Sequence, residues 1–181
     1  MKNLYKDLAK LTPKGTVKLE LSHVFVSPTH TWATDGHYAV RVADEHPGWK
    51  HTHAIPAWYA EKCMVGAVLT ENEDCTLSGT ITHKRNGVEI LTPPDPLCEV
   101  KNIVDVIDSV AWDLVKDYTN ETTEQMPTCS AVLLAPLIEF IGKHANDYSK
   151  GVQIRHGGKK LPVHISDSTC KVEAVLMPFT S

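Results

Sequence analysis

The sequence predicts an α+β fold made of repeated units, each with one short helix packed over antiparallel strands. Three observations support this prediction. Short segments rich in valine, isoleucine and threonine alternate with polar residues along the chain, which is typical of half-buried strands. Glycine-containing turns separate several of these segments. A short apolar run, a proline and a helical pattern follow one another twice, around Pro56 and Pro136.

Composition is that of an ordinary globular protein. The chain has 181 residues, of which 42% are hydrophobic and 22% are charged, enough for one large domain or two small ones. No apolar stretch approaches the roughly 18 residues of a membrane span, and Met1–Lys6 lacks the apolar block of a secretory signal. We therefore expect a cytoplasmic protein without a membrane partner. The net charge of -4 argues against a protein whose whole surface coats nucleic acid, but it permits one basic face.

The first dozen residues have the pattern of an amphipathic helix. Its apolar positions are Leu4, Leu8 and Leu11, and Pro13 ends the pattern. Three lysines recur every four residues, about two positions out of phase with the leucines. At about 100° per residue, this offset places them on the face opposite the core. These residues are Lys2, Lys6 and Lys10.

Strands and turns make up the rest of the first half. The expected strands are residues 16–21, 24–26, 32–34 and 38–42, with a turn at Asp35-Gly36. A strand over residues 52–55 then leads through Pro56 into a short helix over residues 57–64. A hairpin over residues 75–83 and 88–91 completes this half.

The second half repeats this plan. We expect a strand over residues 129–134, a helix that Pro136 opens and that ends at His144, and strands over residues 152–156, 163–166 and 172–177. Between the halves, residues 100–114 carry an apolar stripe typical of a helix, and residues 120–125 form a polar linker.

Two motifs resemble one known family. Ala33-Thr34-Asp35-Gly36-His37, between two expected strands, resembles the signature of the middle domain of the bacterial DNA polymerase III beta subunit, the sliding clamp. The stretch from Ala174 to Ser181 resembles the tail of that family, in which two apolar residues precede Met-Pro. Ala54-Ile55-Pro56 resembles the start of a helix in the clamp's middle domain. The sequence departs from the family at Tyr38 and Ala39, where the family has arginine and leucine, and at Thr180-Ser181.

The resemblance implies the DNA-clamp fold, with repeated strand-helix-hairpin units whose helices cover one face of antiparallel sheets. Residues 1–98 would correspond to the clamp's middle domain, and residues 99–181 to a shortened version of its last domain. Such a short chain would close a homo-oligomeric ring from three or four copies. This compact build would suit a phage protein.

The resemblance also implies the sites. In the family, the two motifs form a hydrophobic pocket for a short peptide of a DNA polymerase or another client. One wall would comprise Thr34, Gly36, His37, Tyr38 and Ala39, and the other Val175, Leu176, Met177, Pro178 and Phe179. Basic helices would hold double-stranded DNA through its phosphates, independently of sequence. The lysines at matching places are Lys2, Lys6, Lys10, Lys62 and Lys143.

The protein is therefore expected to be a processivity factor in DNA replication, not an enzyme, without a cofactor or a metal. His51-Thr52-His53 is the tightest histidine pair, but no neighbouring carboxylate or cysteine completes a metal site, so a polar strand face is the simpler interpretation. One alternative is a partial clamp mimic or adaptor that competes for clamp clients without encircling DNA. The other is an enzyme with Asp35 and His37 as an acid–base pair and Cys129 or Ser130 as a nucleophile. No spacing indicates a triad, and no phosphate-binding glycine loop occurs.

Overall fold

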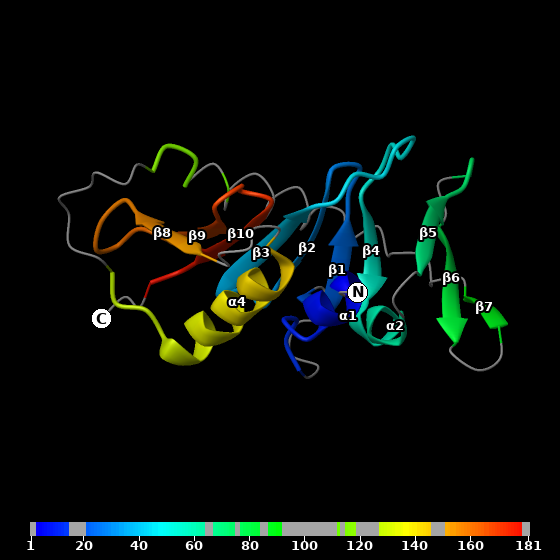
Figure 1. Ribbon diagram of the computed structural model, residues 1–181, viewed down its shortest axis with the longest axis horizontal. Coiled ribbons are helices and arrows are strands. Elements are labelled where there is room, and N and C mark those ends of the chain that lie inside the picture. Colours follow the sequence, from blue (N-terminus) through cyan, green and yellow to red (C-terminus); the bar gives the residue numbers. More distant parts are fainter. Residues whose placement is uncertain are drawn as a thin grey trace.

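The computed structural model describes residues 3–14, 21–63, 67–74, 77–83, 87–91, 112, 115–118, 127–145 and 151–178. This part of the chain contains three helices and two antiparallel sheets (Figure 1). The helices are α1 (Leu4–Ala9), α2 (Ala57–Lys62) and α4 (Ala131–His144). The strands are β1 (His23–Val26), β2 (His30–Thr34), β3 (Tyr38–Ala43), β4 (His53–Pro56), β5 (Val68–Glu71), β6 (Leu77–His83), β7 (Gly87–Leu91), β8 (Val152–His156), β9 (Val163–Asp167) and β10 (Val172–Leu176).

The larger sheet has seven strands in the order β4-β1-β2-β3-β10-β9-β8, and each neighbouring pair is antiparallel. The smaller sheet, β5-β6-β7, lies beyond β4 and α2 (Figure 1). The prediction of an α+β fold with antiparallel sheets is confirmed. The pairing of β3 with β10 carries the larger sheet across the boundary that we expected between residues 98 and 99.

All three helices contact one face of the larger sheet. Side chains on a strand alternate between its faces, so Val24 and Val26 point toward the helices whereas Phe25 points away. Phe25 stacks on Trp32 on that opposite face, with ring centroids 4.2 Å apart. Each large apolar side chain that is fully buried contributes about 1.5–3 kcal/mol to the stability of the fold. The largest in the core between helices and sheet are Leu8, Ile55, Tyr59, Leu137, Ile141, Ile165 and Leu176.

The turn between β2 and β3 follows from its sequence. Asp35 accepts hydrogen bonds at Oδ1 from the backbone N–H groups of His37 (2.8 Å) and Tyr38 (3.0 Å). Gly36 has a φ of 91°, a conformation that side chains with a Cβ rarely adopt. The Thr34 hydroxyl donates to the Tyr38 carbonyl and accepts from the Gly36 N–H. This turn starts β3 in register with β2.

The predicted strand over residues 129–134 is wrong, because α4 already begins at Ala131. Its first turn is helical, since the Leu134 N–H donates to the Ser130 carbonyl over 2.8 Å. Pro136 therefore lies inside the helix, not at its start. A proline there lacks an N–H group and leaves one carbonyl of the preceding turn unpaired. Pro136 is exposed, as is Val132 four residues earlier, so water can reach that carbonyl.

Most other expected elements are confirmed, with small shifts. The helix expected over residues 57–64 ends at Lys62, and β5 was not predicted because only Leu69 of its apolar residues is buried. The strand expected over residues 16–21, the helix over 100–114 and the linker over 120–125 lie outside the described residues, apart from Leu21 and Trp112. Within the described part of the chain, no helix is long and apolar enough to cross a membrane.

Candidate functional site

The two motifs that resemble the family lie side by side in the larger sheet. Tyr38, the first residue of β3, is paired with Leu176, the last residue of β10. Just beyond this pair, the Met177 N–H donates a hydrogen bond to the His37 carbonyl over 2.9 Å. The fold therefore brings together two segments that are far apart in the sequence, although strand alternation sends their side chains to different faces.

Two of the ten predicted pocket residues point into the core between the helices and the sheet. Tyr38 and Leu176 are buried on the helix side of the sheet. The Tyr38 hydroxyl donates to the Leu11 carbonyl over 2.6 Å, and burial raises the pKa of Tyr38. Thr34 is paired with Ala39 and so lies on the opposite face of the sheet, but it is buried too, with its hydroxyl bound to the turn. These side chains hold the β3–β10 junction together and are not accessible to a peptide.

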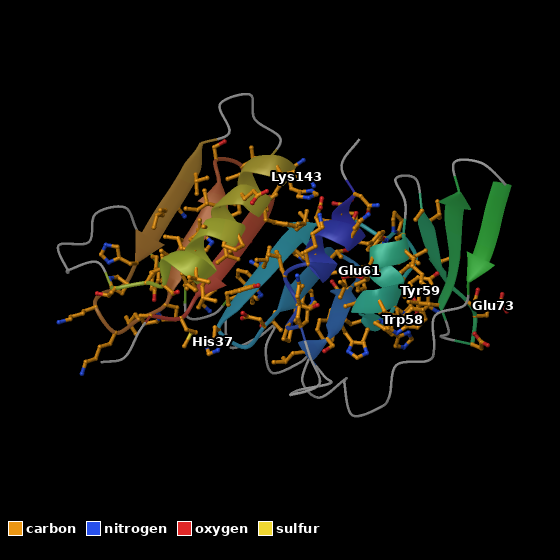
Figure 2. The ribbon with its side chains drawn as sticks, turned by 90° about the horizontal axis from the view of Figure 1, so that it is seen from below. His37, Trp58, Tyr59, Glu61, Glu73 and Lys143 are labelled. Carbon is orange, nitrogen blue, oxygen red and sulfur yellow. The ribbon has the colours of Figure 1, made fainter. Side chains whose placement is uncertain are left out.

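The other described pocket residues lie on the opposite face or on the rim. Ala39 and Val175 point away from the helices and pack together on the far face of the sheet. At the rim, Gly36 and His37 are exposed, and Met177 is 49% exposed. His37 is labelled in Figure 2. Pro178 is half-buried, and Phe179 lies outside the described residues. We call the far face around Ala39 and Val175, with this rim, the outer client surface, after the client binding that the resemblance of the two motifs implies.

The side chains of Arg41, Glu173 and His164 border the outer client surface. The Arg41 Nε donates to Glu173 Oε2 over 2.9 Å, and the His164 Nε2 lies 3.0 Å from Glu173 Oε1. Burial favours the neutral acid, but the hydrogen bond from His164 and the charge of Arg41 hold the pKa of Glu173 below its ordinary value. The Arg41 guanidinium also lies 4.0 Å from the centre of the Trp112 ring. The surface is thus apolar at its centre and charged along one side.

The helix side carries the predicted lysines. Lys6 and Lys10 are exposed on α1, and Lys143 is exposed near the C-terminal end of α4. Lys62, on α2, lies 5.0 Å from the centre of the Trp58 ring, which is half exposed (Figure 2). Lys2 lies outside the described residues. The expected lysine face of α1 is therefore opposite its buried leucines, as its spacing indicates.

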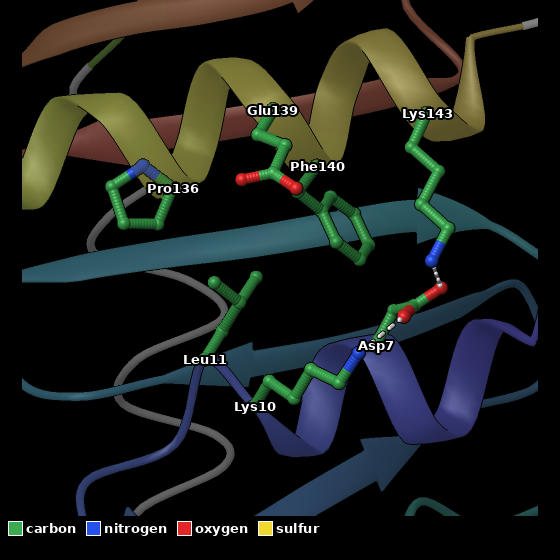
Figure 3. A pocket seen from close by; sticks show the side chains of 7 residues that line it. All are labelled: Asp7, Lys10, Leu11, Pro136, Glu139, Phe140 and Lys143. Atoms are coloured by element: carbon green, nitrogen blue, oxygen red, sulfur yellow. Dashed lines mark hydrogen bonds and ion pairs between the residues drawn. The ribbon is translucent and has the colours of Figure 1, made fainter.

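An aspartate that the sequence analysis did not single out lies between these lysines. Asp7 Oδ1 is 3.3 Å from the Lys10 Nζ, and its Oδ2 is 2.6 Å from the Lys143 Nζ (Figure 3). The His144 Nε2 lies 3.1 Å from the same Oδ2. Burial favours the neutral acid, but the hydrogen bonds from Lys143, His144 and Lys10 hold the pKa of Asp7 below its ordinary value. One carboxylate thus connects α1 with α4 and partly neutralises two of the predicted lysines.

A groove separates the two helices at this point. It has a volume of about 160 Å³. It is lined by Asp7, Lys10, Leu11, Pro136, Glu139, Phe140 and Lys143 (Figure 3). Its lining combines three apolar side chains with two carboxylates and two ammonium groups, so it has no strong excess of either charge.

This arrangement of helices and sheet matches solved structures. A DNA polymerase III beta subunit from Eubacterium rectale superposes with a TM-score of 0.57 at 10% identity, over 99% of this chain and 63% of that one. The chain has the sliding-clamp fold. A beta sliding clamp from C. crescentus gives a TM-score of 0.53 at 11% identity, over 98% of this chain and 62% of that one. A sliding clamp from Bartonella birtlesii, solved with griselimycin, gives 0.53 at 12% identity, over 99% and 64%.

The sliding-clamp fold is reached here by a shorter chain, which spans less than two thirds of the length of these structures. No protein-family model matches the sequence, and no curated protein does. The likeness therefore lies in the order and packing of the elements, with little shared sequence outside short motifs.

His51 and His53 both lie near a carboxylate that comes from a different segment of the chain. Glu71 of β5 places Oε1 2.6 Å from the His51 Nδ1 and 3.4 Å from the His53 Nε2. Burial favours the neutral acid, but these histidines and the Lys50 N–H hold the pKa of Glu71 below its ordinary value. Among the residues that the structure describes, no group of three histidine, cysteine, aspartate or glutamate side chains is arranged to hold a metal ion. The contact joins the smaller sheet to the start of β4 and to the residues just before it.

The lowered pKa of Glu173 predicts how stability depends on pH at the outer client surface. Because the folded state lowers this pKa, the carboxylate stabilises the fold above its unfolded value of about 4.5, and this contribution is lost as the pH falls through the folded value. Urea unfolding of the wild type and of Glu173→Gln should therefore differ at neutral pH and converge below about pH 4.5. The exposed Glu45→Gln is the control and should show no such convergence. A difference that stays constant down to acid pH would contradict the assignment.

Proposed function

We propose that the protein is a DNA sliding clamp that assembles into a ring around double-stranded DNA and binds client proteins, including a DNA polymerase, through the outer client surface. The proposal is supported chiefly by the division of the larger sheet into two faces. One face carries the three helices with their exposed lysines, and the other carries the apolar junction of β3 and β10. A clamp needs one face for DNA and a separate face for clients.

On the DNA side, the lysines of α1, α2 and α4 would contact phosphates without reading sequence. Lys6 and Lys62 have no aspartate or glutamate ion pair in the part of the chain that the structure describes, so we assign them the strongest contacts. Lys10 and Lys143 share Asp7, and DNA would have to compete with that carboxylate. Lys2 continues the same helical spacing.

On the client side, Ala39, Val175, Met177 and Pro178 would provide the apolar contacts. Gly36 has no side chain and lets a peptide approach the backbone closely, and His37 and Met177 are exposed beside it. Tyr38 and Leu176 would position this surface from the helix side, because they are buried below it, and Thr34 would fix the turn before β3 through its hydroxyl. Phe179, which follows Pro178, would extend the apolar area.

Ring closure would use more than one copy. Among the described strands, β4 and β8 end the larger sheet and have a neighbour on one side only. A strand of another copy can add to such an edge, and rotational symmetry then closes a ring. We propose that three or four copies close the ring.

We also propose that the protein is not an enzyme. Asp35 is used by its own turn, where it accepts two backbone N–H groups, so it is not oriented as a partner for the His37 ring. Burial raises the pKa of Cys129, which disfavours the thiolate that a nucleophile needs.

A clamp mimic that binds clients without encircling DNA is the second candidate. The observation that favours it is Asp7, whose charge offsets two of the five predicted DNA-binding lysines. A mimic would keep the outer client surface and bind DNA weakly.

The mass in solution separates these candidates. Light scattering behind a sizing column should give a trimer or tetramer that persists on dilution. The protein should then remain on a nicked circular DNA and leave after the circle is cut once, since only a ring is released at an end. A monomer at all concentrations that still binds clients would contradict the ring and support the mimic.

A further inference from the structure

Part of the outer client surface is covered by the chain itself. Trp112 and Val115 pack on Ala39 and Val175 in one buried cluster, with Tyr118 against its edge. Only 6% of Trp112 and 4% of Val115 are exposed. Ala39 and Val175 are the two centre residues of the outer client surface, so a residue from a peptide could reach them only where Trp112 and Val115 now lie.

The covering segment has the form of a short helical turn. The Val115 N–H donates to the Trp112 carbonyl over 3.2 Å, and the Tyr118 N–H donates to the Val115 carbonyl over 3.1 Å. A spacing of three residues places successive side chains on the same side of such a turn. The turn therefore presents an aromatic residue, an aliphatic residue and a second aromatic residue to the sheet.

Trp112, Val115 and Tyr118 each have a matching place on the surface. The Trp112 ring lies over the Arg41 guanidinium, whose Nε donates a hydrogen bond to Glu173. Val115 fills the small space left by Ala39 and Val175. Tyr118 lies against Gly157, where a Cβ would come within 2.6 Å of the tyrosine ring. The surface thus fits an aromatic residue next to Arg41 and an aliphatic residue next to Ala39.

The side chain of Trp112 is held by packing more than by directional bonds. Its Nε1 is buried and has no hydrogen-bond partner in the part of the chain described. An unpaired buried donor costs free energy. A peptide that packs equally well on this surface without an unpaired donor would therefore displace Trp112 readily.

We propose that the turn carrying Trp112, Val115 and Tyr118 is an internal ligand of the outer client surface, and that this surface selects peptides with an aromatic residue followed three positions later by an aliphatic one. The proposal rests on the client-binding part of the proposed function. An incoming peptide displaces this turn, takes the place of Trp112 beside Arg41 and places its aliphatic residue on Ala39 and Val175. Occupation by the chain's own segment weakens the binding of any peptide that lacks this spacing.

A peptide with the sequence of residues 109–120 tests this proposal directly. It is labelled with fluorescein, and its anisotropy is measured with the wild type and with the Trp112→Ala, Val115→Ala double variant. We expect binding to the double variant at least tenfold tighter than to the wild type. A control peptide with alanine at the positions of Trp112 and Val115 should bind neither protein. Val115→Ala alone keeps the contact between Trp112 and Arg41, and it should give a smaller gain of about threefold.

Three results would overturn the proposal: equal binding to wild type and variants, no binding to any of them, or equal binding of the control peptide. Circular dichroism checks the fold of each variant, and Val115→Ala decides if the double variant does not fold. The assay is separate from ring formation and DNA. If the protein forms a ring on DNA but all variants bind the peptide equally, the internal-ligand proposal is wrong and the ring proposal stands. If the protein is a monomer but its variants bind the peptide tightly, the ring proposal is wrong and the internal-ligand proposal stands.

Discussion

Replacing Asp7 by asparagine is expected to tighten binding of duplex DNA about tenfold at low salt. The carboxylate now holds the ammonium groups of Lys10 and Lys143 at 3.3 and 2.6 Å. Asparagine has nearly the same shape and removes the negative charge, so both lysines become available to phosphates. Each additional phosphate contact makes the slope of log association constant against log salt concentration more negative by about 0.9. Two freed lysines should therefore steepen it by roughly 2.

The measurement is the anisotropy of a labelled duplex at several salt concentrations. Asp117→Asn is the matched control, because it makes the same change in charge at an exposed residue of the segment that packs on the opposite face. Lys6→Glu should act in the other direction and weaken binding. Loss of the two ion pairs should lower the free energy of unfolding by at most about 1 kcal/mol each, since both ammonium groups are about half exposed. If Asp7→Asn and Asp117→Asn increased the affinity for DNA equally, only the net charge would matter. Asp7 would then have no specific effect on the DNA-binding lysines.

Leu176→Ala is expected to lower the free energy of unfolding by about 2–5 kcal/mol, the range for a leucine in a close-packed core. Leu176 is fully buried on the helix side, opposite Tyr38, and alanine would leave a cavity between α4 and the sheet. The measurement is urea denaturation followed by circular dichroism.

Met177→Ala, one residue further along, separates stability from binding. Met177 is 49% exposed, so its loss should change the free energy of unfolding by no more than about 0.5 kcal/mol. It should nevertheless weaken binding of a client peptide, because its side chain is at the rim of the outer client surface. If Met177→Ala destabilised the protein as much as Leu176→Ala, the two residues would not differ in role, and the division of this motif between core and surface would be wrong.

The local sequence pattern predicted most helices and strands well. It predicted poorly which distant segments contact one another. The alternation in β3 and the turn at Asp35-Gly36 were predictable, because their hydrogen bonds and burial depend on neighbours in sequence. The spacing of Leu8 and Leu11 likewise predicted which face of α1 carries Lys6 and Lys10. The error at Pro136 came from an apolar run that fits a strand or a buried helix equally well.

Contacts between distant segments account for what sequence reasoning missed. Asp7 and Lys143 are 136 positions apart, and no local pattern indicates that they form an ion pair. Strand periodicity could have placed Arg41 on the same face as Ala39, since they are two residues apart on β3. Only the fold shows that Trp112 covers both. The resemblance of the two motifs to one family predicted that residues 34–39 and 175–179 lie together, which strand periodicity alone does not predict.

The pairing of β3 with β10 also affects how the chain folds during synthesis. Val42 pairs with Val172, so β3 emerges from the ribosome well over one hundred residues before its partner. Until then β1, β2 and β3 form a meander with an open, apolar edge, which can pair with other nascent chains. Contacts of such long sequence separation also form slowly. Expression at lower temperature, or with a chaperone that covers exposed strands, should therefore increase the yield of folded protein more than it does for proteins whose sheets close locally.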